Sequence, residues 1–375
     1  MLQMRHQVAS MHNRAQPSVA VASTCGQAHM LRVAASMRQL HIQCAIPQQQ
    51  DARRTHKTVV RVASAAAERF AAAGAATGTL QTDFKFACPI CYTTEFVVQG
   101  SAHYQPCRCG RCGRTFEAKG QYLDLTLTSG VQQQVYEQKM WQGTELFRQP
   151  LVSFVYERGW RQNFAGAGFP GAEKEYDMAM QYLAPAQGGV LIDASCGTGL
   201  FTRLFARSRR FAGVVALDFS ESMLQQAQQF FAQDPALKTS TPIVAVRGDI
   251  GRLPFATGSV DAIHAGAAIH CWPNPQAAMA EVSRVLKPGG VFVASTFLTP
   301  LAPLGELIGD STVRPLSQTF NPFGRGNQTF RYWEEDELKD LTTAVGLQDY
   351  TRTRSRMFIM FAATKPPAER QPEQW

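Results

Sequence analysis

The sequence predicts an α/β protein whose core is a mostly parallel sheet. From Gly188 onward, short apolar runs alternate with segments of helical periodicity, and this order is typical of a parallel sheet with helices on both faces. Upstream, five of the nine cysteines crowd into residues 88–112, which indicates a small metal-binding module. The first 65 residues differ from both parts, because they are rich in arginine and hold a single acid.

The net charge of +8 belongs almost entirely to this N-terminal segment. Residues 1–65 carry eight basic side chains against Asp51 alone, whereas the remaining residues are nearly neutral. A segment rich in Arg, Ser, Ala and Gln, without a long apolar core, predicts an organellar transit peptide, with an untargeted disordered tail as the alternative. Composition alone does not separate a chloroplast address from a mitochondrial one, and cleavage is expected within Val62–Gly78. No run of about 18 apolar residues appears, so no transmembrane segment is expected.

The cysteine module consists of two C-x2-C pairs, Cys88 with Cys91 and Cys109 with Cys112, separated by 17 residues. This spacing lies in the range of four-cysteine zinc sites, in which two tight turns close a tetrahedron around the metal. Four thiolates leave no position for a substrate, so a structural zinc ion is expected. A ribbon that has lost its metal is the alternative, and Cys107 is a spare that could replace Cys109.

The expected elements downstream follow in a regular order. Strands are expected at 190–194, 213–217, 243–246, 260–264 and 291–296, and two closing strands within 346–363. Helices are expected at 200–206, 221–231, 276–286 and 335–344. Ser220 is a suitable N-cap for the second helix, and the Lys-Pro-Gly-Gly run at 287–290 should stop the third. Ligands of such sheets bind beyond the carboxyl ends of the strands.

The segment DASCGTG follows the first strand and combines Asp193 with Gly197 and Gly199. A dinucleotide would place its pyrophosphate at such a turn, where Asp193 would repel it, and the third glycine of G-x-G-x-x-G is missing. A ligand with a cationic group suits Asp193 better, and S-adenosylmethionine carries an ammonium and a sulfonium. The glycines allow the backbone to approach this ligand closely.

Two further acids follow the next two strands. Asp218 ends the second strand, where a carboxylate can accept both ribose hydroxyls of a nucleoside. Asp249 follows the third strand and could accept the adenine amino group, with Phe219 and Ile250 covering the faces of the base. Each acid alone could be a helix cap or a surface group, but three at successive strand ends indicate one binding site.

The segments LIDASCGTG, VVALDFSESML, VRGDIGRLPFATGSVDAIHAGAAIHCW and EVSRVLKPGGVFVAST resemble the class I S-adenosylmethionine-dependent methyltransferases. The resemblance spans residues 188–297 and implies a Rossmann-like fold with a mostly parallel seven-stranded sheet. Ser195 stands where the usual family motif has glycine. The cofactor-binding residues that the resemblance and the strand ends imply are Asp193, Ser195, Gly197, Gly199, Asp218, Phe219, Asp249, Ile250 and Ala265.

A second resemblance rests on FACPICY, YLDLT, YERGWRQNF and GFPGAEKEYDMAMQYL, which are similar to segments of plant and algal chloroplast methyltransferases. Those proteins pair an N-terminal zinc ribbon with a ubiquinone/menaquinone-type methyltransferase domain and are associated with plastoglobules, the plastid lipid droplets. The expected domains are therefore a disordered transit peptide (1–70), a zinc ribbon (83–127), a helical region on the substrate side (131–187) and the cofactor-binding domain (188–365), with a substrate lid at 298–333.

Methyl transfer from a sulfonium requires alignment of the acceptor, and a general base is needed only when the acceptor must lose a proton. His270, just beyond the fourth strand, is the first candidate for such a base, and His264 is the second. The alternative for both is a packed histidine that orders a loop. Cys196 and Cys271 are expected to be small buried residues rather than nucleophiles.

The function that these observations favour is a plastid methyltransferase with a small lipophilic, prenylquinone-like acceptor. The aromatic side chains of 298–333 and the helical pattern at 144–160 would supply the walls for it, and peripheral association with lipid droplets or a membrane is expected. The alternative is a ribosomal RNA guanine methyltransferase with a zinc ribbon. The near-neutral charge of residues 66–375 argues against a nucleic-acid partner, although Arg108, Arg111, Arg114 and Lys119 form a local basic patch. A scaffold that binds the cofactor without turnover is a third hypothesis.

Overall fold

The computed structural model describes residues 84–98, 104–130, 161–319 and 331–368. The expected transit peptide, the helical pattern at 144–160 and the middle of the expected lid lie outside the described residues.

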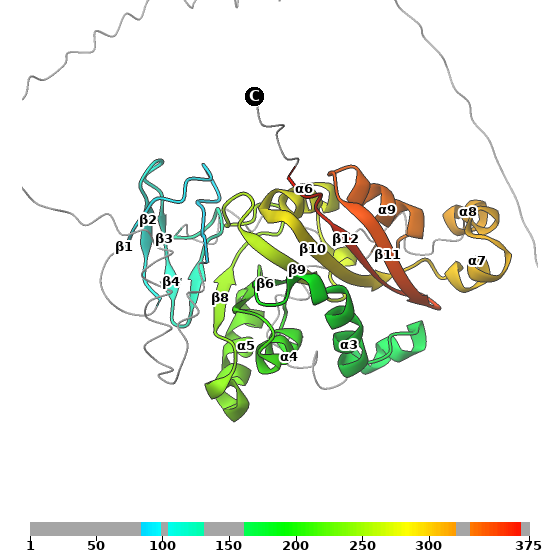
Figure 1. Cartoon of the computed structure of the whole chain (residues 1–375), viewed down its shortest axis with the longest axis horizontal. Coiled ribbons are helices and arrows are strands. Elements are labelled where there is room, and N and C mark those ends of the chain that lie inside the picture. The colour runs from blue at the N-terminus through cyan, green and yellow to red at the C-terminus, as the bar shows by residue number, and fades with distance from the viewer. Residues whose placement is uncertain (1–83, 99–103, 131–160, 320–330, 369–375) are drawn as a thin grey trace, which may run out of the picture. The chain divides into compact units, whose positions relative to one another are not determined.

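A nine-stranded sheet forms the centre of the described structure (Figure 1). Its strands, in spatial order, are β11 (Gln348–Ser355), β12 (Phe358–Thr364), β10 (Leu286–Phe297), β9 (Val260–Ala265), β6 (Val190–Ala194), β7 (Gly213–Asp218), β8 (Ile243–Arg247), β5 (Tyr122–Asp124) and β4 (Ala118–Lys119). Neighbours from β10 to β5 run parallel, whereas β12, β11 and β4 pair antiparallel. The predicted α/β class and the mostly parallel sheet are confirmed.

Two of these strands extend the expected seven-stranded sheet. β5 and β4 come from the segment that follows the cysteine pairs, and Leu123 of β5 aligns with Val246 of β8. All three residues of β5 are buried, which fits a short strand that adds to the edge of a parallel sheet. The cysteine module is thereby joined to the sheet through the backbone.

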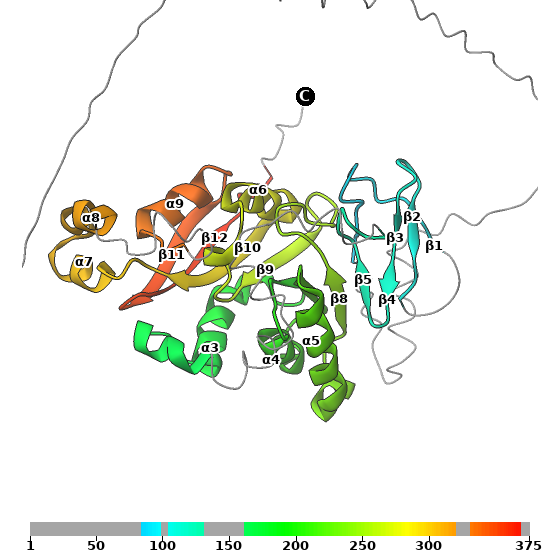
Figure 2. The same cartoon turned by 180° about the vertical axis from the view of Figure 1, so that it is seen from behind.

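Helices cover both faces of the sheet. One face carries α3 (Ala172–Tyr182), α4 (Leu200–Ser208) and α5 (Glu221–Gln233), and the opposite face carries α6 (Pro275–Val285) and α9 (Glu335–Thr343), as Figures 1 and 2 show. Short 3-10 helices lie at Arg161–Ala167 (η4), Ala184–Ala186 (η5), Pro235–Thr239 (η6) and Ile269–Cys271 (η7). None of the described helices has both the length and the apolar character that a bilayer span requires.

The side chains of the central strands alternate between two apolar clusters, because successive residues of a strand point to opposite faces. Leu191 of β6 clusters with Phe201 and Phe205 of α4, whereas its neighbour Ile192 belongs to the cluster that includes Met279 of α6. Every residue of β6 is buried. The run Val-Leu-Ile-Asp-Ala is therefore buried on both sides, as a strand covered by helices on both faces requires.

The helix boundaries follow the expected signals. The Ser220 side chain accepts a hydrogen bond from the Met223 N–H at the start of α5, as predicted. Asn274 caps α6 in the same way through the Ala277 N–H, at 3.0 Å. α6 ends at Val285, two residues before the Lys-Pro-Gly-Gly run, and that run lies inside β10, which begins at Leu286, five residues before the predicted start. The strand begins early because Leu286 pairs with Val260 across an irregularity in the register.

The N-terminal module contains a three-stranded antiparallel sheet of β1 (Phe96–Val98), β2 (Cys107–Cys109) and β3 (Thr115–Phe116). The residues that precede β1 lie against the segment after β8. The Ala87 N–H donates to Pro254 O, and the Ala256 N–H donates to Lys85 O. The buried side chains of this module and those of the adjoining sheet face form one apolar cluster.

The expected lid at 298–333 contains two helices, for which the sequence analysis gave no expectation. These are α7 (Ala302–Ile308) and α8 (Asp310–Thr319), separated by Gly309 at φ 96°. Proline in the first turn suits the start of α7, because its missing N–H is not needed there. The role of this segment as a lid stays a prediction.

Candidate active site and metal centre

The turn after β6 carries three residues in the left-handed region: Ser195 (φ 56°), Gly197 (φ 56°) and Gly199 (φ 76°). At position 199 a Cβ atom would lie 2.5 Å from Cε1 of Phe231 on α5. Glycine is required there both by conformation and by the packing of α5. The turn delivers the chain directly into α4, whose first residue is Leu200.

Asp193 lies in β6 and is 2% exposed. Its two carboxylate oxygens have separate partners in the protein: the Thr202 hydroxyl donates to Oδ2 at 2.6 Å, and His264 Nδ1 lies 2.9 Å from Oδ1. These contacts fix the orientation of the carboxylate below the glycine-rich turn. Its contact with the cofactor, expected from the sequence, stays a prediction.

His264 occupies the penultimate position of β9 and is fully buried. Its ring packs edge-on against Phe201 and Phe205, with centroids 4.9 Å away in both cases. Its Nε2 atom has no hydrogen-bond partner among the described residues. The enclosed ring contacts Asp193 and so helps to orient its carboxylate. The structure gives no support for His264 as the second candidate for a general base.

Asp218 ends β7 and holds the two loops of the site together. Oδ2 accepts from the Gly197 N–H and Oδ1 accepts from the Ser220 N–H, both at 2.8 Å. Burial raises the pKa of this carboxyl to about 6, and the nearby Asp193 adds to the shift, against the two N–H donors. The carboxylate retains acceptor capacity for further donors, since each oxygen has two lone pairs.

Asp249 and Ile250 form a tight turn after β8. The Gly251 N–H donates to Asp249 Oδ1 at 2.8 Å, and the Arg252 N–H donates to Asp249 O at 2.9 Å. Ile250 is 8% exposed and Asp249 is half-buried. Phe219, on the neighbouring loop, is half-buried, and Arg247 both donates to its carbonyl and lies over its ring.

All the predicted cofactor residues thus lie on or directly beyond the carboxyl ends of four adjacent parallel strands. Ala265, the last of them, ends β9 and is fully buried beside the end of β6. The carboxyl ends of parallel strands meet at one edge of the sheet, so these residues are brought together. Their individual cofactor contacts stay predictions.

Trp272 also belongs to this region, although no role was predicted for it from the sequence. Its indole N–H donates to the Ser195 hydroxyl at 3.1 Å and so ties the loop after β9 to the turn after β6. The side chain is 7% exposed. The dipeptide Cys-Trp before Pro273 was the available signal, because a buried indole N–H usually has a partner.

His270 lies in η7 and is 5% exposed. Nδ1 lies 3.3 Å from the Thr296 hydroxyl, and the ring packs edge-on against Phe297. Burial lowers the pKa of His270 to about 3, so the imidazole is neutral at physiological pH. A base is most effective when its pKa lies near the operating pH, and these surroundings favour the packed-histidine alternative.

Aromatic side chains gather around the end of β10. Phe297 lies 4.5 Å from Phe169 and 4.9 Å from Phe164 between ring centroids, and Phe169 lies 4.7 Å from Phe358. Phe164 is half-buried, and Tyr332 packs against the same cluster. We call Phe164, Phe169, Phe297 and Tyr332 the aromatic wall. Its residues come from η4, the connection between η4 and α3, the end of β10 and the end of the expected lid.

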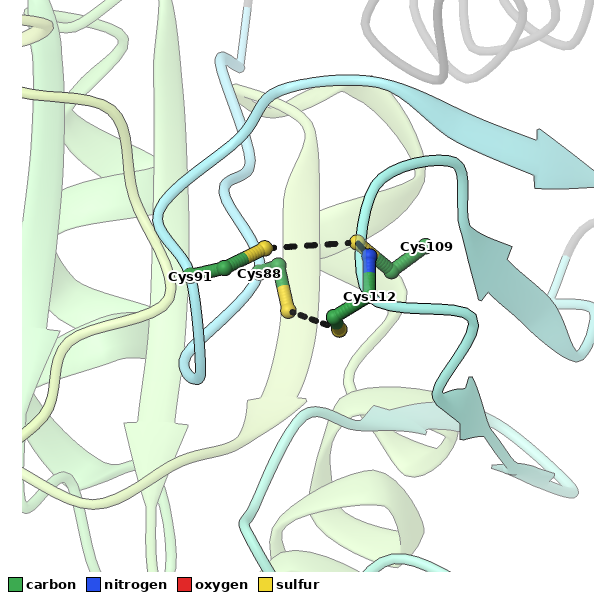
Figure 3. Close-up of side chains that lie close together, drawn as sticks. All are labelled: Cys88, Cys91, Cys109 and Cys112. Carbon is green, nitrogen blue, oxygen red and sulfur yellow. Dashed lines mark hydrogen bonds between the residues drawn. The ribbon is translucent and has the colours of Figure 1, made fainter. Parts of the chain in front are cut away.

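The four predicted metal ligands also come together (Figure 3). The sulfur atoms of Cys88, Cys91, Cys109 and Cys112 all lie within 4.8 Å of one another. Cys88 and Cys112 are 3.7 Å apart, and Cys91 and Cys109 are 3.5 Å apart. A tetrahedral zinc site with Zn–S distances of about 2.3 Å places its sulfurs about 3.8 Å apart, so the donor set fits this metal.

The two cysteine turns have the same local structure. The residue after each pair, Tyr92 or Gly113, has a positive φ, and its N–H donates to the carbonyl of the first cysteine. Each turn therefore points both of its sulfurs to one side. Cys107, the spare of the sequence reading, is 3% exposed in β2 and is not part of the cluster.

A family model described as a methyltransferase domain matches residues 192–294. Two Arabidopsis thaliana proteins, each named an uncharacterized chloroplastic methyltransferase, are 46% and 47% identical over 289 and 287 residues. Each match covers 75% of this chain and 78% of the relative. A demethylmenaquinone methyltransferase of Desulfitobacterium hafniense is 31% identical over 155 residues, which is 41% of this chain and 54% of that protein.

The fold, the strand-end carboxylates and these matches define a class I S-adenosylmethionine-dependent methyltransferase. The chain belongs to the family of the two chloroplastic plant proteins.

Proposed function

We propose that this methyltransferase transfers the methyl group of S-adenosylmethionine to a small lipophilic, prenylquinone-like acceptor in the plastid. The relatives named chloroplastic support the location, and the relative named a demethylmenaquinone methyltransferase supports the acceptor class. The aromatic wall is the structural observation that carries the acceptor class, because it surrounds the last residue of β10, Phe297, which packs against His270 of η7.

The aromatic wall favours a ring with an apolar tail over a charged acceptor. Phe164 and Tyr332 are half-buried, so a quinone-type ring can stack on their exposed edges, whereas Phe169 and Phe297, both 5% exposed, support them from within. A phosphate-rich acceptor such as RNA would need cations to neutralise its charge. Of the basic residues expected for that purpose, Arg108 lies on β2 in the three-stranded sheet and Lys119 lies on β4, the edge strand of the large sheet that is separated from β10 by five strands.

The cofactor is proposed to lie across the carboxyl ends of the strands, with its adenine beyond β8, its ribose beyond β7 and its methionine part beyond β6 and β9. Asp218 accepts the ribose hydroxyls, Asp249 accepts the adenine amino group, and Phe219 and Ile250 cover the base. Gly197, Ser195 and Ala265 surround the methionine part, with Asp193 below them. The cofactor supplies an activated methyl on a positively charged sulfur, and the three carboxylates give this part of the protein a complementary charge.

The chain contributes mainly alignment and exclusion of water. Holding acceptor and methyl donor in line is worth roughly 7–11 kcal/mol in favourable cases. A methyl transfer to a carbon or oxygen of a hydroquinone releases a proton, and neutral His270 is too weakly basic to be required for it. The acceptor proton therefore leaves to solvent or to another group of the site.

The four-cysteine cluster is proposed to hold a structural zinc ion within a ribbon spanning residues 83–127. The thiolates would occupy all four positions of the metal, so the ion stabilises the two turns and takes no part in methyl transfer. The transit peptide at 1–70 and the association with plastid lipid droplets are proposals of the same kind.

The proposed function is tested by incubating the mature chain with radiolabelled S-adenosylmethionine and separate pools of plastid lipid and plastid RNA. We expect label in the lipid pool, with none when Asp218→Ala replaces the wild type. Label in the RNA pool alone would establish the ribosomal RNA alternative. Tight cofactor binding without labelling of either pool would support the scaffold hypothesis.

A further inference from the structure

The first cysteine turn lies directly against the turn that carries Asp249 and Ile250. Arg252 reaches from the second turn to the first: its Nε donates to Pro89 O, and its Nη2 donates to Ile90 O at 3.0 Å. These two carbonyls belong to the residues between Cys88 and Cys91. The guanidinium of Arg252 therefore binds the backbone of the first cysteine turn. The shape of this turn depends on Cys88 and Cys91, which lie at its two ends.

The same arginine closes the turn on the cofactor side. The Arg252 N–H donates to Asp249 O at 2.9 Å, and the intervening Gly251 N–H donates to the Asp249 carboxylate. Arg252 thus has its main chain in the proposed adenine turn and its side chain on the cysteine turn. A shift of one turn is transmitted to the other through one residue.

Neighbouring contacts hold the two turns in register. Tyr92, which follows Cys91, lies under Arg252 and Arg284, with guanidinium carbons 5.2 Å and 4.4 Å from its ring centroid. Its hydroxyl donates to Glu281 at 3.3 Å, and the same carboxylate accepts from the Leu253 N–H at 2.7 Å. Charged groups that are this well partnered give directional contacts, so the interface has one preferred arrangement.

We propose that Arg252 is a positioning residue that couples the cysteine cluster to the cofactor site. A metal ion held by the four cysteines fixes the carbonyls of Pro89 and Ile90, and Arg252 then fixes the turn that presents Asp249 and Ile250 to adenine. Metal and S-adenosylmethionine consequently bind with positive cooperativity. The inference rests on the proposed zinc site and on the proposed adenine role of this turn.

Cooperativity of this kind is reciprocal, because two ligands of one protein change each other's affinity by the same factor. Zinc should strengthen cofactor binding, and the cofactor should strengthen zinc binding equally. Thermodynamics requires this equality whatever carries the coupling, so it checks the two affinity measurements against each other, and the route of the coupling is identified by substitution.

The test uses the mature chain as wild type, Arg252→Met, Arg252→Lys and Arg108→Met. Arg108 is the matched control, because its Nε donates to Gly113 O on the second cysteine turn. Calorimetry gives the Kd for S-adenosylmethionine with zinc loaded and with zinc removed by a chelator. Competition with a chromogenic chelator gives the zinc affinity with and without S-adenosylmethionine.

In the wild type, we expect zinc removal to weaken cofactor binding at least about fivefold, the lower end of usual coupling factors, with a matching factor for zinc. Zinc-loaded Arg252→Met should bind the cofactor as weakly as the zinc-free wild type, and its coupling factor should fall to about one. Arg252→Lys should recover part of the factor, and Arg108→Met should retain all of it.

The proposal is overturned if the wild type binds the cofactor equally well with and without zinc, or if Arg252→Met keeps the wild-type factor. A chain that takes up no zinc contradicts both this proposal and the zinc site, as metal analysis shows directly. A chain that takes up zinc but binds no S-adenosylmethionine contradicts the cofactor site itself, and the proposal fails with it.

Discussion

The indole Nε1 of Trp272 lies 3.1 Å from Oγ of Ser195 and joins the loops that follow β9 and β6. Ser195 adopts φ 56°, a conformation that costs a residue other than glycine about 1–2 kcal/mol. The hydrogen bond gives a reason for serine at a strained position where the family motif has glycine. It also places the segment that contains His270 next to the glycine-rich turn after β6.

Trp272→Phe should keep the packing and remove the hydrogen bond. A lost hydrogen bond of about 1 kcal/mol predicts a Kd for S-adenosylmethionine raised about fivefold. Ser195→Gly is the matched variant: it also removes the bond but relieves the strain, so its free energy of unfolding should stay within about 1 kcal/mol of wild type. Wild-type cofactor affinity in both variants, measured by calorimetry, would exclude a role for this contact.

Cofactor affinity should depend on the ionisation of Asp218. Its pKa is raised to about 6 chiefly by burial, so the carboxylate form that accepts the ribose hydroxyls is lost as the pH falls through 6. We expect binding up to about tenfold weaker at pH 5 than at pH 7. The same raised pKa stabilises the cofactor-free fold at low pH, and this contribution is lost as the pH rises through 6. A Kd that does not vary between pH 5 and 7 would contradict the ribose role.

His270→Gln should leave most of the methyl transfer intact. A required general base contributes roughly 10²–10⁴-fold, whereas we expect kcat to fall less than about tenfold, because His270 with a pKa of about 3 is a poor base. The lowered pKa also means that the folded chain loses stability as the pH falls below 6.5, since only the unfolded histidine takes up a proton there. The variant should lose that part of the acid sensitivity. A kcat reduced more than a hundredfold would restore the base role.

Arg354 should control the expected lid. Its guanidinium, 3% exposed, donates to Ala302 O at 2.6 Å, to Asp310 at 2.8 Å and to Glu335 at 2.9 Å, and so joins α7, α8 and α9. Arg354→Met should raise KM for the acceptor with little change in the Kd for S-adenosylmethionine. Arg352→Met is the control, because Arg352 pairs with the same Glu335 and, among the described residues, has no ion pair with the lid helices. Equal effects of the two variants on KM would argue against a lid.

Substitution of the two cysteines of β2, Cys107 and Cys109, should have different effects on zinc binding. Cys109→Ser removes one sulfur of the cluster and should abolish stoichiometric zinc, measured by metal analysis of the purified chain. Cys107→Ser should retain one zinc per chain, because the buried sulfur of Cys107 does not belong to the four-sulfur cluster. If instead Cys107→Ser lost the metal while Cys109→Ser kept it, the ligand assignment would be wrong.

Much of the fold could be predicted because it follows from local patterns. The strand Val190–Ala194 and the cap at Ser220 lie where the apolar run and the capping residue placed them. The addition of β5 to the sheet could not be predicted, because a three-residue strand has no periodicity of its own and its partner lies more than 100 residues downstream. The helices of the expected lid were missed because a run rich in Leu, Pro and Gly resembles a loop.

The sequence predicts which residues of the candidate site lie at the strand ends, because these residues directly follow the apolar runs that form the strands. The contacts within the site could not be predicted, because they join residues that are distant in the sequence. His264 lies 71 positions from Asp193, and Trp272 lies 77 positions from Ser195. The low pKa of His270 likewise results from burial by segments that the sequence does not place relative to one another.

The most direct test of the account is calorimetry of the mature chain with S-adenosylmethionine and, separately, with a nicotinamide dinucleotide. We predict one site per chain for S-adenosylmethionine, lost in Asp218→Ala and retained in Asp261→Asn, whose carboxylate lies at the opposite, amino end of β9. No heat is expected with the dinucleotide. Binding of the dinucleotide in place of S-adenosylmethionine would contradict the account.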